Sequence, residues 1–241
     1  MLLVLLMTAI VSFGQGKQIT KQSAVGAKGV TYAIDAPSVL FSQMTPSADP
    51  AIASQTFPDF GNCTMQGADD FTVPAGPSWN VSRVDVIGVL GGGPVSFFDV
   101  FIYADAAGSP GAPVYSATGL AFTQNTNVFT ITLTSAAILP AGTYWISVVA
   151  NMPFVPNGQY FWQPNTGPLA GNVFYWRDPC NLATGFTNWT PGPVAFPSFT
   201  NFDLCFALLG NDFEVPISNW ALYLGIGLIL VFAVVRFRRA V

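Results

Sequence analysis

The sequence contains no histidine, and charged residues make up only 8% of its 241 positions, against about 25% in a typical soluble domain. Without histidine, the Ser-His-Asp and Cys-His catalytic systems and every metal site that needs imidazole are excluded. Between residues 30 and 215 only Arg83 and Arg177 are basic, against twelve acidic residues, which leaves a formal charge of −10. This charge argues against nucleic acid or an anionic lipid surface as a partner.

The N-terminal end is apolar. Residues 1–13 read MLLVLLMTAIVSF, a run too short to span a bilayer, which takes about 20 helical residues. The run ends in small residues, and Gly14 precedes Gln15, a pattern typical of a secretory signal peptide, although no lysine or arginine comes before it. We therefore expect a signal peptide over residues 1–14 and Gln15 as the first mature residue. The alternative is a buried N-terminal helix or strand.

The C-terminal end carries a longer apolar segment. Residues 217–235 are 19 positions without a charge, and as a helix they would span about 28 Å, close to the hydrocarbon thickness of a bilayer. Arg236, Arg238 and Arg239 follow directly and, by the positive-inside rule, stay in the cytoplasm. A buried core helix would have one polar face, and this segment has none. We expect a single transmembrane helix with its N-terminal side outside and its C-terminal side inside.

A short motif precedes this segment. Val215, Pro216, Ser218, Asn219 and Trp220, followed by the apolar span and the arginines, resemble C-terminal sorting signals of the PEP-CTERM and IPTL-CTERM type. The resemblance covers residues 215–241, and Asn219 stands where the nearest form of the motif has an acidic residue. It implies that residues 212–241 are a sorting signal read by an exosortase-like membrane enzyme. The protein would then enter the inner membrane of a bacterial envelope and be released or moved to the cell surface. The alternative is a plain single-span anchor.

The region between the two ends divides at about residue 58. Residues 15–57 show no sustained periodicity and predict a flexible leader with one early strand. Residues 58–211 contain short β-prone runs between turns rich in Gly, Pro and Asn. They predict an all-β domain, a single antiparallel β-sandwich or jelly roll of about nine strands. The expected strands are residues 70–73, 79–90, 97–104, 114–117, 128–133, 144–149, 160–163, 173–176 and 202–209.

Two further features bear on this domain. Alternation predicts that Val84 and Val86 face opposite to Arg83, and that Phe101 is buried in the core. Residues 69–74 and 103–111 also resemble secreted bacterial β-sandwich modules that commonly precede such sorting tails. This second resemblance implies the same fold and no particular ligand.

The chain has three cysteines, Cys63, Cys180 and Cys205. In an exported protein two of them should form a disulfide and leave one free. Cys63 and Cys180 lie in expected loops and Cys205 in the last expected strand, so we favour the pair Cys63–Cys180, although all three pairings remain open.

The acidic and aromatic residues offer the candidates for a site. Asp69 and Asp70 are adjacent, but neighbours in a strand point to opposite faces and form no facing pair; they are weak calcium candidates, and no other metal or cofactor is expected. Trp162, Trp176 and Trp189 are candidates for stacking on a sugar, with core packing as the alternative.

These features together predict an exported, non-catalytic envelope protein. It would present its β-sandwich for contact with other cells, matrix or glycan, with the membrane as a further partner. The alternative is a secreted jelly-roll hydrolase, for instance a glycosidase, with the same anchor. That alternative lacks an evident pair of carboxylates at a useful spacing.

Overall fold

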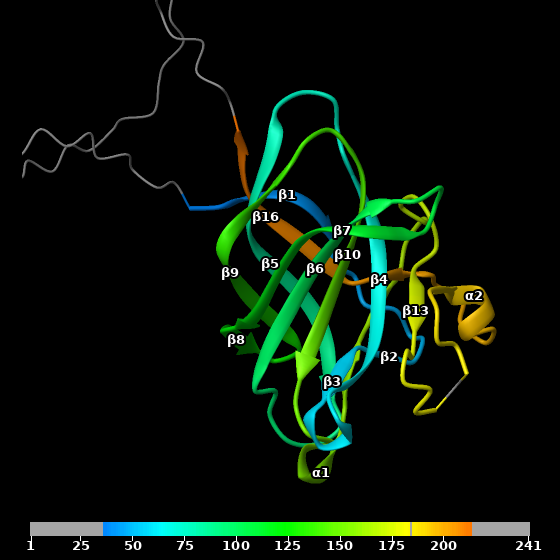
Figure 1. Cartoon of the computed structure of the whole chain (residues 1–241). Coiled ribbons are helices and arrows are strands. Elements are labelled where there is room, and N and C mark those ends of the chain that lie inside the picture. Colours follow the sequence, from blue (N-terminus) through cyan, green and yellow to red (C-terminus); the bar gives the residue numbers. More distant parts are fainter. Residues whose placement is uncertain (1–35, 184, 214–241) are drawn as a thin grey trace, which may run out of the picture. The chain divides into compact units, whose positions relative to one another are not determined.

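The computed structural model describes residues 36–183 and 185–213 (Figure 1). Within them the regular secondary structure is mostly β-strand, with two main sheets of seven strands each in a sandwich-like arrangement. A third, small sheet joins β12 (Pro164–Asn165) and β15 (Asp203–Leu204). The predicted all-β class is therefore confirmed.

The first sheet is built around β5 (Ser78–Leu90), which pairs with β16, β9 and β11. The order is β1–β16–β5–β11–β2, and β8 joins through β9. In Figure 1, β1 and β16 run side by side, as their antiparallel register requires. The other strands of this sheet are β1 (Ser38–Gln43), β2 (Ile52–Ala53), β8 (Phe122–Asn125), β9 (Val128–Leu139), β11 (Tyr160–Trp162) and β16 (Phe206–Phe213).

The second sheet has the order β14–β13–β4–β3–β10–β6–β7. Strands β4 and β10 pair directly near one end and separate near the other, where β3 lies between them and runs parallel to β10. The strands are β3 (Gln55–Phe57), β4 (Cys63–Val73), β6 (Phe97–Asp105), β7 (Pro110–Leu120), β10 (Gly142–Asn151), β13 (Tyr175–Arg177) and β14 (Thr190–Pro191). Three short helical turns complete the described part: η1 (Pro58–Phe60), α1 (Phe154–Asn157) and α2 (Gly192–Ala195).

The main core lies between the two sheets and is rich in aromatic rings. Phe98 of β6 contacts Phe129 of β9 and Tyr160 of β11 with ring centroids 5.4 and 5.3 Å apart, which joins the two sheets. Val84 and Val86 also face this core, as the alternation of β5 predicts. Many of the phenylalanines of this charge-poor chain thus pack in the core.

Strand β6 corrects one prediction. Phe98, Val100 and Ile102 face the core, while Phe101 lies on the outer face of the sheet and is only half-buried. The prediction that Phe101 is buried in the core is wrong, because this strand has aromatic residues on both faces and its sequence fits either register.

Residues 36–57 also differ from the prediction. β1, β2 and β3 lie within residues 15–57, for which the sequence predicts a flexible leader. That prediction is wrong for residues 36–57, because β1 completes an edge of the first sheet and β3 fills the gap between β4 and β10. The described residues hold sixteen strands rather than the nine or so predicted. Most of the additional strands have only two to four residues, which is too short for an alternating pattern to show in the sequence.

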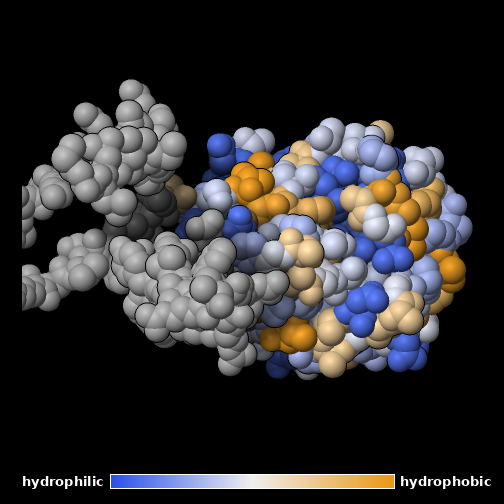
Figure 2. All heavy atoms as spheres, turned by 90° about the horizontal axis from the view of Figure 1, so that it is seen from above, coloured by the Kyte–Doolittle hydropathy of each residue, from blue (hydrophilic) through white to orange (hydrophobic). Residues whose placement is uncertain are grey.

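The surface of the described part is mixed. Figure 2 shows polar and apolar residues interspersed on the face seen from above, with only small apolar groups among them. Such a surface is typical of a domain that faces water.

Candidate functional site

The disulfide joins the two cysteines that the sequence favours. Cys63 is the first residue of β4 and pairs with Cys180, with their Cα atoms 5.7 Å apart, while Cys205 is free and buried. Burial raises the pKa of the Cys205 thiol to about 12, so this group stays protonated and unreactive. The bond ties the segment after β13 to β4, and it is typical of an extracellular or periplasmic domain.

This segment covers part of the outer face of the second sheet. Tyr103 and Trp145 point away from the main core, yet they are buried, because rings from residues 175–189 pack against them. Tyr175 meets Trp145 edge-on at 5.2 Å, and Trp189 meets Tyr103 edge-on at 5.7 Å between ring centroids. The outer face therefore carries a second, smaller aromatic cluster, to which Phe101 also belongs.

Arg177 is fixed in place beside this cluster. Its Nε and Nη2 donate to Oε1 of Gln66 at 2.9 and 2.6 Å, and Nε2 of Gln66 donates to the hydroxyl of Tyr103 at 2.9 Å. Its Cζ lies 4.1 Å from the centroid of a ring of Trp189, which is a cation–π contact. Desolvation lowers the pKa of Arg177, but a guanidinium remains charged in proteins.

The charge of Arg177 has no acidic partner among the residues that the structure describes. The other arginine there, Arg83, donates to both carboxylate oxygens of Asp85 at 2.8 and 2.5 Å. Arg177 instead neighbours an amide, a phenol and an indole. It is thus a preorganised positive charge in a strongly acidic domain.

An open pocket of about 410 Å³ lies next to Arg177, and we call it the Arg177 pocket. Its residues come from the outer face of β3, β4 and β6 and from the segment that the disulfide holds. They are Thr56, Asn62, Thr64, Gln66, Asp99, Phe101, Tyr103, Arg177, Pro179 and Cys180. The pocket combines two rings, one cation, one carboxylate and several neutral hydrogen-bonding groups.

Asp99 is the only carboxylate among these lining residues. Its Oδ1 accepts a hydrogen bond from the backbone N–H of Gly119 at 2.8 Å. Partial burial raises the pKa of Asp99 in spite of that bond. Its other oxygen has no partner among the described protein groups and is available to a hydroxyl donor.

The three candidate tryptophans lie in different environments. Trp162 and Trp176 are buried, and their Nε1 groups donate to the backbone oxygens of Cys205 at 2.8 Å and Ala53 at 2.7 Å. Both side chains belong to the core, so the prediction that they contact a ligand is wrong. Trp189 is half-buried and contacts Arg177, but it is not among the residues that line the pocket.

The two calcium candidates are enclosed by protein donors. Oδ2 of Asp69 accepts hydrogen bonds from Nε2 of Gln43 at 2.7 Å and from the N–H of Leu204 at 2.6 Å. Both oxygens of Asp70 accept from Asn172, at 2.8 and 3.1 Å. Among residues 36–183 and 185–213 no three His, Cys, Asp or Glu side chains form a group that could hold a metal ion. This geometry supports a structural role and gives no support to the predicted calcium site.

A third buried acid, Asp203, completes this group. Its Oδ2 accepts from the N–H of Ala170 at 2.9 Å, so Asp70 and Asp203 together hold residues 170–172 against the sheet. Desolvation raises the pKa of Asp69 well above its ordinary value and that of Asp70 to about 6, and the Coulombic repulsion of Asp203 adds to both shifts. Burial likewise raises the pKa of Asp203.

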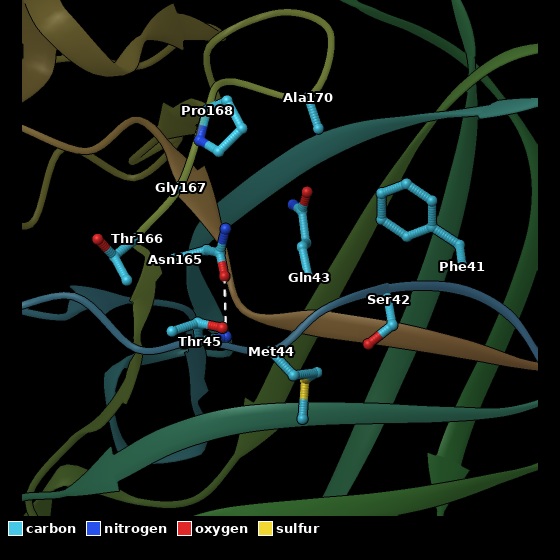
Figure 3. Close-up of a pocket in the computed structure, with 10 residues that line it drawn as sticks. All are labelled: Phe41, Ser42, Gln43, Met44, Thr45, Asn165, Thr166, Gly167, Pro168 and Ala170. Carbon is cyan, nitrogen blue, oxygen red and sulfur yellow. Dashed lines mark hydrogen bonds between the residues drawn. The ribbon is translucent and has the colours of Figure 1, made fainter.

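A second cavity, of about 420 Å³, lies between β1 and residues 165–170 (Figure 3). Figure 3 shows the Gln43 side chain between Phe41 and the loop that carries Pro168 and Ala170. The Oε1 atom of Gln43 is buried and has no partner among the described protein groups. The lining of this cavity contains no charged residue and a single aromatic ring, so it offers fewer binding groups than the Arg177 pocket.

The two ends of the chain are outside the described residues. This applies to the signal peptide over residues 1–14, to the motif from Val215 to Trp220, to the apolar span 217–235 and to the arginines Arg236, Arg238 and Arg239. Within the described part, no helix has the length and apolar character needed to cross a bilayer.

Sequence reasoning missed the site itself. Gln66, Tyr103 and Arg177 lie on three separate strands, so nothing in the local pattern joins them. One signal was present: Arg177 is one of only two basic residues between residues 30 and 215. Comparison of the chain with protein-family models, with curated proteins and with solved structures found no match.

Proposed function

We propose that the chain is an exported, non-catalytic protein of the cell envelope whose β-sandwich binds an extracellular glycan in the Arg177 pocket. The observation that carries this proposal is the fixed guanidinium of Arg177, held by Gln66 and Trp189 beside two rings and an open pocket. Preorganisation of this kind lowers the entropy lost on binding.

The lining of the pocket suits a sugar. A pyranose offers apolar C–H faces, which pack on rings, and hydroxyl groups, which both donate and accept hydrogen bonds. Phe101 and Tyr103 supply the rings, while Asp99, Asn62 and the pair Thr56–Thr64 supply polar atoms. The disulfide at Cys180 keeps one wall of the pocket in position without a ligand.

The pocket favours binding over hydrolysis. Glycosidases of the common type place two carboxyl groups on either side of the scissile bond, about 5 to 10 Å apart. Asp99 is the sole carboxylate that lines this pocket, whereas Asp69, Asp70 and Asp203 are buried beneath protein donors elsewhere. We therefore infer a binding protein rather than the jelly-roll hydrolase.

A glycan array tests the proposal. The full chain, kept in a mild detergent because its sequence predicts an apolar span, should bind a subset of the saccharides. Phe101→Ser should weaken that binding, because it removes a ring from the pocket. Ile138→Ser, which changes an exposed apolar residue of the other sheet, is the matched control and should bind like the parent. A blank array, or equal binding by the Phe101 variant, would overturn the proposal.

The envelope location rests on the two ends and on the disulfide. We infer that the C-terminal segment sorts the protein through an exosortase-like enzyme, which reads the motif around Pro216 and Trp220. Proline disfavours the continuation of a helix and favours an extended preceding residue, and an extended backbone is the form that a processing enzyme binds, so Pro216 is the residue to test.

The sorting step has its own test in the native host. The parent should be shortened near residue 216 and leave the inner membrane, whereas Pro216→Ala combined with Trp220→Ala should remain there at full length. Membrane fractionation with mass mapping of the C-terminus separates these outcomes. A parent that keeps Val241 would reduce the segment to a plain anchor.

A further inference from the structure

We propose that the Arg177 pocket selects saccharides in which a uronic acid is joined to an uncharged sugar. This inference rests on the proposed glycan binding and adds the chemical class of the ligand. It follows from the positions of the two charged groups of the pocket, Arg177 and Asp99.

Arg177 supplies the group that recognises a carboxylate. Nε and Nη2 of Arg177 share the single acceptor Oε1 of Gln66, and no described carboxylate neutralises the guanidinium. A guanidinium has five N–H donors, so hydrogens on its Nη groups remain for a ligand. The ring of Trp189 lies 4.1 Å from Cζ and Gln66 accepts hydrogen bonds from one edge, so the guanidinium is held in place for a planar anion.

Asp99, at the other end of the pocket, disfavours a carboxylate and favours a hydroxyl group of the ligand. Asp99 lies four positions before Tyr103 along β6, which corresponds to about 13 Å of extended strand. Tyr103 marks the Arg177 end of the pocket, because its hydroxyl accepts a hydrogen bond from Gln66, which in turn holds Arg177. Phe101 lies between Asp99 and Tyr103 on the same outer face. A carboxylate beside Asp99 would be repelled, whereas a hydroxyl there could donate to the free oxygen. The pocket is therefore positive at one end and negative at the other, with a ring between.

The acidic character of the whole domain does not cancel this preference. At physiological salt, exposed charges are largely screened beyond about 8 Å, so distant acids have little effect on a ligand that touches Arg177. Arg177 is itself partly desolvated, so a carboxylate in direct contact with its guanidinium would be screened much less.

The test uses a tetrasaccharide of alternating glucuronic acid and N-acetylglucosamine, together with its methyl ester, which has the same shape without the charge. Isothermal titration with the full chain in detergent should give at least about a tenfold weaker Kd for the ester, the loss expected for one charge-assisted hydrogen bond. Arg177→Gln should weaken binding of the acid by at least the same factor and binding of the ester less, so that the difference between acid and ester is largely lost. Arg83→Gln, which removes the arginine already paired with Asp85, is the matched control and should change neither.

The outcomes separate this inference from the proposed function. If the acid and the ester bind equally, the inference is overturned while glycan binding stands; if neither binds and the array is blank, both fail. The comparison of acid with ester uses the parent chain alone, so it remains decisive even where Arg177→Gln lowers the melting temperature. A trisaccharide made only of galacturonic acid should bind more weakly than the alternating saccharide, and Asp99→Asn should reduce that difference. Equal binding of the two saccharides by the parent would contradict the role given to Asp99.

Discussion

The buried acid Asp70 should make the protein more stable in mild acid than at neutral pH. Its pKa is raised from 3.8 to about 6 in the folded state, chiefly by desolvation, so folding favours the protonated form. The stabilisation is fully present below about pH 4 and is lost as the pH rises through about 6. A shift of about two units corresponds to about 3 kcal/mol in the free energy of unfolding, or roughly 6–12 °C in Tm for a domain of this size. Asp69 and Asp203, whose pKa values burial also raises, act in the same direction.

Urea unfolding at pH 4.5 and pH 7.5, with the disulfide intact, measures this effect. In Asp70→Asn the side chain stays neutral and can still accept from the N–H of Asn172. The difference between the two pH values should therefore shrink by about 2 kcal/mol, the part of the stabilisation that is lost between pH 4.5 and pH 7.5. Asp212→Asn changes an exposed acid and should leave the difference as in the parent. A parent that is more stable at pH 7.5 than at pH 4.5, or an Asp70 variant with the parent's full pH dependence, would refute the reasoning.

Three further predictions concern the disulfide, the core and export. Replacing both Cys63 and Cys180 by Ser should lower the free energy of unfolding by about 4–5 kcal/mol, because the bond closes a loop across 117 residues; equal urea midpoints for variant and parent would contradict this. Phe98→Ala should cost about 3–5 kcal/mol and Phe101→Ala less than half as much, since only Phe98 is fully buried; thermal melts in which the two variants unfold together would show that the faces of β6 are misassigned. Mass spectrometry of the exported protein should find Gln15 as its first residue, and an intact N-terminal methionine would disprove the predicted cleavage.

The long strands could be predicted from the sequence because each carries its own pattern. In β5 and β9 apolar and polar residues alternate over many positions, and turn residues stand at the ends. The short strands lack such a pattern: β2 and β3 have two and three residues and owe their conformation to the strands beside them. Tertiary pairing, rather than local preference, therefore makes strands of these segments within residues 36–57.

The candidate site was less predictable for a related reason. A ring in a strand looks the same in the sequence whether it faces the core, as Trp162 does, or the outer cluster, as Phe101 does. The segment that covers the outer face turns some outward positions, such as Trp145, into buried ones. Cysteine pairing was easier, because the redox compartment and the expected positions of Cys63 and Cys180 outside the long strands both favour the observed bond, although Cys63 is in fact the first residue of β4.

The most direct test of the central claim is to locate the bound saccharide by hydrogen–deuterium exchange of the full chain. With the tightest-binding saccharide from the array, we expect slower exchange in peptides that cover residues 62–67, 98–104 and 177–180, which line the Arg177 pocket. Peptides over residues 41–45 and 165–170, which line the cavity around Gln43, should exchange as in the free protein. Protection confined to that second cavity, or none at the Arg177 pocket, would contradict the account.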